Sequence, residues 1–311
     1  MVGIWDGVLA SSTCTYLHTA ASLGQLGDLQ HTVFSRQDPS APRNCLEHAL
    51  DSILAELDDS SSHVEYWWRE TWEHVEAHAD LDEVLFESRS VARYPSRAHV
   101  LYLNIGAAVR APTCVWEAST LRDSKLEEDR HADFGAMTVV PARSGRLLRF
   151  HGDMMHAVPK PTHAWLPTLH GSMPKRKKAP AAELVRSVLL FNTWDEAPEG
   201  VGPAPSTDPR AVIEQLARDF SSPKIEALVK VMAVPDERCQ PASEWTPVVP
   251  RELPCASGGN AVPMSVALLG TRARRQHEGP SLQMAAPEGL LDALMEPLSV
   301  TSFEQPAPAQ R

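Results

Sequence analysis

Residues 186–194 read RSVLLFNTW, and this run decides the fold class. It is rich in β-branched, aromatic and other apolar residues and contains no glycine or proline, which is typical of a buried strand. Shorter runs of the same kind precede it, and turn residues separate most of them: 64–69, 84–87, 99–105, 113–117, 137–140, 146–150 and 155–158. Many short strands with turns between them predict a sandwich, a barrel or a jelly roll.

Helical patterns flank this series of strands. In Arg43–Leu57 the apolar residues recur at three- and four-residue spacing, and Ser11 or Ser12 can cap an earlier helix that ends at Leu23. We therefore expect a helical segment over residues 1–62 that packs on a β-rich core over residues 63–200.

Residues 201–311 are expected to complete the same domain. Asp208-Pro209 and Ser222-Pro223 each place a capping oxygen before a proline, which predicts two helix starts. The run Met264–Gly270 is interpreted as one more strand that rejoins the sheet.

Composition narrows the function classes. The 311 residues carry a formal net charge of −11, which argues against a nucleic-acid partner. The five cysteines have no C-x-x-C spacing, which favours a reducing compartment. No secretory signal or membrane span is evident, so a cytoplasmic protein that acts on a peptide or a small molecule is expected. The sequence leaves the oligomeric state open.

His78-Ala79-Asp80 is an H-x-D triplet in a stretch that we expect to be extended. Residues two apart on a strand face the same side, so both side chains can reach one metal ion. His156, on a distant predicted strand, supplies a third ligand. Two histidines and one carboxylate on one face of an octahedron are typical of non-haem Fe(II) sites. Arg186, at the start of the last strand, can bind a carboxylate in a buried site.

A second triplet, His131-Ala132-Asp133, competes with the first. Only 25 residues separate His131 from His156, which leaves room for about one hairpin. From His78 to His156 the distance is 78 residues, enough for four strands of ordinary length. We therefore assign the ligands to His78, Asp80 and His156.

The ordered set from the H-x-D triplet through Tyr102-Leu103-Asn104, Pro112-Thr113 and the run 145–150 to His156 and Arg186 resembles the prolyl 4-hydroxylase-like Fe(II)- and 2-oxoglutarate-dependent oxygenases. The resemblance covers roughly residues 63–194. It implies a double-stranded β-helix and a dioxygenase that couples oxidative decarboxylation of 2-oxoglutarate to hydroxylation. It also implies that Arg186, Tyr102 and Thr113 bind the cosubstrate, with O₂ as the second cosubstrate. Ascorbate is left open as a further cofactor.

Some features depart from this pattern or leave alternatives. Val188 stands where many relatives carry Ser or Thr. Trp67 and Trp68 are adjacent on one predicted strand and face opposite sides, and we assign Trp68 to the substrate mouth. No catalytic residue beyond the metal ligands is predicted. A non-catalytic jelly-roll binding module and a zinc-dependent hydrolase remain as alternative functions.

Overall fold

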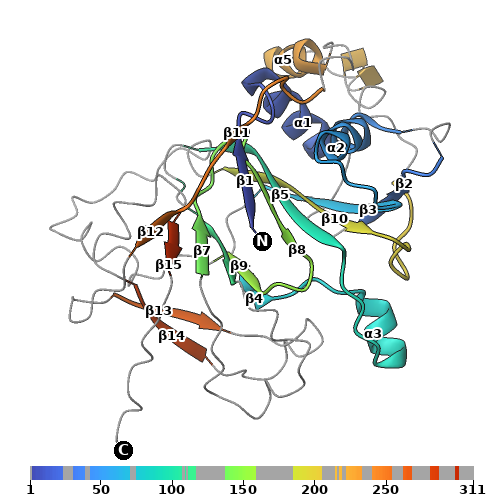
Figure 1. Ribbon diagram of the computed structural model, residues 1–311. Coiled ribbons are helices and arrows are strands. Elements are labelled where there is room, and N and C mark those ends of the chain that lie inside the picture. Colours follow the sequence, from blue (N-terminus) through green and yellow to red (C-terminus); the bar gives the residue numbers. More distant parts are fainter. Residues whose placement is uncertain are drawn as a thin grey trace, which may run out of the picture.

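The computed structural model describes residues 2–23, 31–38, 43–70, 75–106, 109, 111–116, 137–158, 185–204, 214–215, 217–218, 222–232, 240–253, 262–267, 281–286 and 298–300. Within these residues the chain forms two larger β-sheets, one two-stranded sheet and a group of helices that lies against one of the larger sheets (Figure 1). The expectation of a mainly β protein with flanking helices is confirmed at this level.

The first sheet has seven strands, and each neighbouring pair is antiparallel. The longest strands, β5 and β10, lie side by side at its centre, with a shift of register between Ser187 and Val188. The order across the sheet is β11 (Thr246–Pro247), β1 (Gly3–Asp6), β8 (Leu147–His151), β5 (Arg97–Ile105), β10 (Arg186–Trp194), β3 (His63–Arg69) and β2 (Thr32–Ser35).

The second sheet has six strands, and its pairs are antiparallel except for the parallel pair of β12 and β15. Its order is β12 (Arg251–Leu253), β15 (Leu298–Val300), β7 (Met137–Val140), β6 (Thr113–Trp116), β9 (His156–Val158) and β4 (Val75–His78). Strands β4 and β9 are neighbours at one end of this sheet, and they carry His78 and His156.

A buried apolar cluster joins the two sheets. Its members come from β1, β5, β8 and β10 of the seven-stranded sheet and from β6 and β7 of the six-stranded sheet, and they include Tyr102, Val115, Val140, Phe150 and Val188. Since both sheets contribute side chains to one cluster, their inner faces oppose each other across a shared core.

The helices cover the outer face of the seven-stranded sheet. Helices α1 (Ser11–Leu23) and α2 (Cys45–Glu56) share an apolar cluster with β3, β5, β8 and β10, and α5 (Pro223–Met232) packs against it (Figure 1). A capping box starts α2: the Asn44 side chain accepts from the Glu47 backbone N–H, and Glu47 accepts from that of Asn44. The hydroxyl of Tyr66 on β3 donates to Glu47 Oε1 at 3.1 Å, which ties this end of α2 to the sheet.

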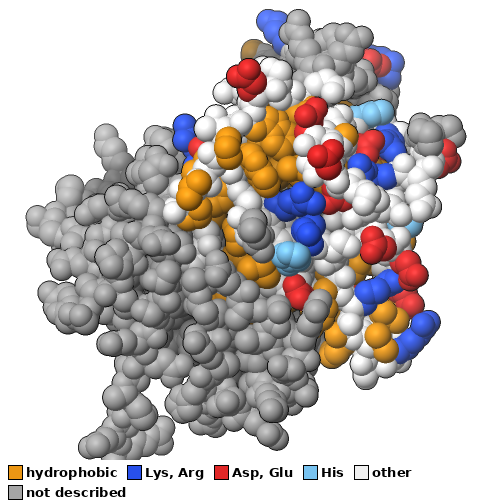
Figure 2. Space-filling model, viewed as in Figure 1, with side chains coloured by type: hydrophobic (Ala, Val, Ile, Leu, Met, Phe, Trp, Pro, Cys, Tyr) orange, Lys and Arg blue, Asp and Glu red, His pale blue; other side chains and the backbone are white. Residues whose placement is uncertain are grey.

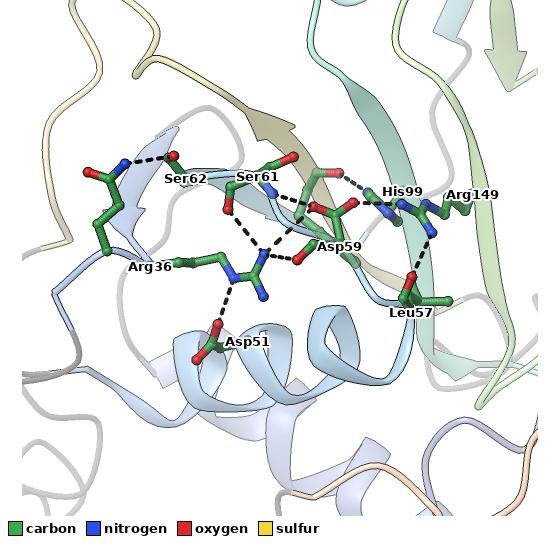
Figure 3. Close-up of polar contacts among 10 residues, drawn as sticks. Arg36, Asp51, Leu57, Asp59, Ser61, Ser62, His99 and Arg149 are labelled. Carbon is green, nitrogen blue, oxygen red and sulfur yellow. Dashed lines mark hydrogen bonds and ion pairs between the residues drawn. The ribbon is translucent and has the colours of Figure 1, made fainter.

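A buried ionic network holds the segment between α2 and β3 (Figure 3). Asp59 accepts from Arg149 Nη2 on β8 at 2.6 Å, and the Asp59 backbone carbonyl accepts from Arg36 Nη1 at 2.6 Å. Arg36 also donates to Asp51 on α2. Neighbouring His99 is buried, and this burial lowers its pKa to about 3. The network connects α2 and the segment before β3 with β8, beside His99 of β5, on the side of the sheet remote from the core between the sheets.

Several local expectations were wrong. Residues 84–87 belong to helix α3 (Glu83–Arg89) and not to a strand, because Asp82 caps a helix by accepting from the Leu85 backbone N–H at 3.0 Å. The segment over residues 1–62 also contains two strands, β1 and β2, at positions in the seven-stranded sheet. Short strands of four residues carry too little periodicity to be recognised from the sequence.

The C-terminal part also differs from expectation. Residues 262–267 form β13 (Val262–Ala267), which pairs with β14 (Ser281–Ala286) in a separate sheet and does not rejoin the larger ones. The strands that do rejoin them are β11, β12 and β15. The helix that begins after Ser222 is present as α5, whereas the helix predicted after Asp208 lies largely outside the described residues.

On the face shown in Figure 2, acidic and basic side chains are mixed around α3, and hydrophobic side chains are gathered over the middle of the described part. Neither sign of charge forms a broad patch on this face. Across the described residues, no helix is both long enough and apolar enough to cross a membrane.

Candidate metal centre

Strands β4 and β9 bring His78 and His156 side by side. The two residues are Cα partners in the antiparallel pair, and their ring centroids lie 4.3 Å apart. Asp80 follows two residues later, beyond the end of β4, and its Oδ1 lies 3.6 Å from His78 Nε2 and 3.8 Å from His156 Nε2. The structure therefore brings together the three residues that the sequence analysis selected, although Asp80 reaches the site from a loop and not from the strand.

The three ligand atoms fit a single metal ion. All lie within 4.8 Å of one another, and they form the only such group among the described histidine, cysteine and acidic residues. Ligands at right angles around a metal about 2.1 Å away are roughly 3 Å apart, so a small contraction would close the site. His131 and Asp133 lie outside the described residues, so the structure does not compare the two triplets directly.

Burial and hydrogen bonds act on two of the candidate ligands, His156 and Asp80. Desolvation, followed by the neighbouring His78, lowers the pKa of His156 to about 4, so its imidazole is neutral and can donate a lone pair. His156 Nδ1 lies 3.3 Å from the Met154 carbonyl, and a proton donated there leaves Nε2 free to face the metal. Asn192 on β10 donates from Nδ2 to Asp80 Oδ2 at 3.2 Å, which turns the other carboxylate oxygen toward the histidines.

Sequence reasoning missed Asn192. It is 3% exposed, and its position within an otherwise apolar strand was the available signal. A buried amide in such a strand requires hydrogen-bond partners, and here one partner is the Asp80 carboxylate, from the loop after β4.

Arg186, Tyr102 and Thr113 form a second polar group in the core between the sheets. Tyr102 and Thr113 hydroxyl oxygens lie 2.7 Å apart, and Arg186 Nη2 donates to Thr113 Oγ1 at 3.4 Å. The Arg186 guanidinium also lies 5.7 Å from the centroid of the Tyr102 ring. The three residues predicted to bind one carboxylate are thus in mutual contact.

The environment of Arg186 is suited to an anion. The residue is 4% exposed, and its Nε is buried without a hydrogen-bond partner. Burial lowers the pKa of Arg186, and nearby Arg69 on β3 lowers it further. An uncompensated cation in the core costs free energy, and a carboxylate in front of it would recover that cost.

The resemblance implied a Ser or Thr two residues after Arg186, where this chain has Val188, and the adjacent Ser187 does not supply a hydroxyl there. Ser187 faces the helical side, where its hydroxyl accepts from Trp68 Nε1 at 2.8 Å and lies 2.9 Å from His18 Nδ1. Val188 belongs to the core between the sheets. The hydroxyl beside the guanidinium comes instead from Thr113 on the other sheet.

A cavity of about 490 Å³ opens beside the metal centre and is lined by His78, Asp80 and Asn192 among others. Trp67 lines this cavity, whereas Trp68 packs in the apolar cluster beneath α1 and α2. Trp68 was assigned to the substrate mouth, but the register of β3 turns Trp68 toward the helices and Trp67 toward the cavity.

No family model matches the chain, and no curated protein matches it. Among solved structures, a prolyl-4-hydroxylase of Pseudomonas putida is 15% identical with a TM-score of 0.36, and the match covers 63% of this chain and 88% of that one. HygX from Streptomyces hygroscopicus, crystallised with nickel and 2-oxoglutarate, is 14% identical with a TM-score of 0.36, over 65% of this chain and 91% of that one. The alpha-ketoglutarate-dependent carbocyclase SnoK from nogalamycin biosynthesis is 12% identical with a TM-score of 0.36, over 80% and 92%. These identities and TM-scores are low.

Proposed function

We propose that the chain is a non-haem Fe(II)- and 2-oxoglutarate-dependent oxygenase, with its two facing sheets as the halves of a double-stranded β-helix. The observation that carries the proposal is the pairing of two groups in one core. A His-Asp-His set lies on β4, β9 and the loop after β4, and a buried arginine with two hydroxyl partners lies on β10, β5 and β6.

The ligand set suits ferrous iron. His78, Asp80 and His156 would occupy one face of an octahedron and leave the opposite positions open for a chelating 2-oxo acid and O₂. Asn192 would hold the Asp80 carboxylate in its orientation, and the Met154 carbonyl would hold the His156 tautomer.

Arg186 would bind the far carboxylate of 2-oxoglutarate. The anion would take the unpartnered Nε–H of Arg186, and the hydroxyls of Thr113 and Tyr102 would complete its hydrogen bonds. Arg69 would add a second positive charge near a dianionic cosubstrate. The apolar side chains around this group, among them Val188 and Val115, would exclude water from it.

Bound iron would supply the activation of O₂ that couples the two half-reactions. In the proposed reaction, one oxygen atom of O₂ converts a substrate C–H bond to C–OH, and the other oxygen atom enters succinate. Carbon 1 of 2-oxoglutarate leaves as CO₂. The protein's part is to bind both reactants in one water-poor space and to keep the three ligands fixed.

The test is metal analysis and turnover of protein that is purified without O₂ and then supplied with Fe(II). We expect about one iron per chain and succinate formation that requires Fe(II), 2-oxoglutarate and O₂, with ascorbate tested as an accessory reductant. The Asp80→Ala variant should lose both iron and succinate formation.

Two outcomes would support the alternatives. Tight zinc binding without any 2-oxoglutarate binding would favour a hydrolase, since two histidines and a carboxylate can also hold catalytic zinc. The absence of any bound metal would favour a binding module on the same scaffold.

A further inference from the structure

Glu65 on β3 is a buried carboxylate that lines the cavity beside the metal centre. It is 6% exposed. His31 Nδ1 lies 2.7 Å from its Oε1, and Trp194 Nε1 donates to its Oε2 at 3.1 Å. The imidazole and the indole hold the Glu65 carboxylate in place, and the imidazole forms an ion pair with it when His31 is protonated.

The charged residues that line the cavity are acidic or histidine. Among the described residues that line it there is no lysine or arginine, whereas Asp82, Glu83 and Glu199 add carboxylates to those of Glu65 and Asp80. Glu83 is only partly buried. Asp82 is neutralised by Arg93 and caps α3, and Glu199 is ion-paired with Arg89 at 3.3 Å. With Asp80 assigned to the metal, Glu65 is a buried cavity carboxylate whose partners, His31 and Trp194, include no lysine or arginine.

Two residues that line this cavity also carry a buried polar atom without a hydrogen-bond partner. These atoms are Trp67 Nε1 and Asn192 Oδ1, on side chains that are 4% and 3% exposed. Buried polar groups are normally paired, so an unpaired donor and an unpaired acceptor on residues that line a cavity point to a polar ligand.

The sheet register places Glu65 close to the metal ligands. Glu65 and Asn192 are direct Cα partners on β3 and β10, and Asn192 donates to the Asp80 carboxylate. Cross-strand neighbours of this kind have Cβ atoms roughly 5 Å apart. A group bound at Glu65 therefore lies close to the candidate metal ligands.

We infer that this cavity binds a small molecule that carries a protonated amine or guanidinium, and that Glu65 is the residue that selects the positive charge. The cation would lie at Glu65, and the remainder of the molecule would extend toward His78 and Asp80. A volume of about 490 Å³ is in the range of small-molecule sites. The assignment of this ligand as the substrate rests on the proposed oxygenase function. The binding of a cation at Glu65 does not depend on that function.

The experiment uses two probes of matched shape, cyclohexylamine and cyclohexanol, titrated by ligand-observed NMR into the full chain at pH 8. At this pH an alkylamine is charged, like a lysine with a pKa near 10.4, and an ordinary histidine with a pKa near 6.5 is neutral. The titrations are made without metal and again with Ni(II) and 2-oxoglutarate. We expect the amine to bind at least about tenfold more tightly than the alcohol.

The variant Glu65→Gln keeps the shape of the side chain and removes its charge. It should lower the amine affinity at least about tenfold and leave the alcohol unchanged. The matched control is Glu70→Gln, which removes the same charge from a half-exposed position at the end of β3 that does not line the cavity. It should leave both affinities within about twofold.

Equal affinity of the wild-type chain for the two probes would overturn the inference, even if Glu65→Gln failed to fold. An unchanged amine affinity in a folded Glu65→Gln variant would do the same. If iron and 2-oxoglutarate bind but the amine shows no preference, this inference fails alone. If the amine binds through Glu65 but iron and 2-oxoglutarate do not, the cation site stands and the oxygenase proposal fails.

Discussion

Replacement of Arg186 by methionine tests the cosubstrate site most directly. Methionine keeps an unbranched side chain in a position that is 4% exposed, but it removes the charge and all the N–H donors. Loss of one partner of a buried charge pair costs about 2–5 kcal/mol. We therefore expect Arg186→Met to bind 2-oxoglutarate at least about 30-fold more weakly.

Iron binding should be retained in this variant. The Arg186 side chain contacts Thr113 and Tyr102, and the metal ligands are oriented by other groups, namely Asn192 and the Met154 carbonyl. The folded protein should also lose no stability in the absence of ligand. Burial disfavours the Arg186 charge, so its removal is expected to raise the free energy of unfolding by on the order of 1 kcal/mol.

The assay is calorimetric titration of 2-oxoglutarate into Ni(II)-loaded protein, with metal content and thermal unfolding measured on the same sample. Arg143→Met is the matched control, because its side chain is 60% exposed and pairs with Asp6 at the surface. It should bind 2-oxoglutarate like the wild type. An unchanged 2-oxoglutarate affinity in Arg186→Met would remove this residue from the site and weaken the assignment of the cosubstrate itself.

Three further predictions concern the ligands, their support and the pH dependence of stability. His78→Ala should abolish iron binding and His131→Ala should preserve it, as measured by metal content; equal loss in both variants would show that the first triplet was wrongly preferred. Asn192→Leu removes the donor to Asp80 and should weaken metal affinity about 10- to 100-fold in a competition titration with a chelator, and an unchanged affinity would contradict its role. Between about pH 6.5 and pH 3, a histidine in the unfolded chain is protonated, whereas buried His99 in the folded protein is not. Because the unfolded state then binds more protons, the free energy of unfolding falls as the pH is lowered through this window. Denaturant titrations from pH 7 to pH 5 should show this decline, and the His99→Leu variant should reduce its slope by up to about 1.4 kcal/mol per pH unit; an identical slope would exclude His99 as a source.

The metal-ligand candidates and Arg186 could be selected from local pattern and spacing, whereas Tyr102 and Thr113 were implied by the family resemblance. The rule that residues two apart share one face of a strand holds only approximately for His78 and Asp80, because Asp80 lies just beyond the end of β4. The number of residues between this triplet and His156 had indicated four intervening strands, and four described strands, β5 to β8, do lie there. Arg186 was identifiable because a charged residue begins an otherwise apolar run. Their roles in binding iron and 2-oxoglutarate remain proposals.

The choice between Trp67 and Trp68 shows where sequence reasoning stopped. Alternation established that the two side chains face opposite sides of β3, but not which side holds the site. That depends on the pairing of β3 with β10, where Trp67 lies opposite Leu190 and Trp68 opposite Leu189, and on the helices that cover only one face.

The sequence by itself determined a β-rich fold, the helices that cover it and a set of metal-ligand and arginine candidates, because periodicity and spacing are properties of neighbouring residues. Only the tertiary structure decided which face of β3 lines the cavity, that Asn192 supports Asp80, and that Glu65 lies beside them. These relations join residues more than a hundred positions apart through the register of paired strands. A shift of one residue in that register would turn each of these side chains to the opposite face, and no local pattern in the chain specifies it.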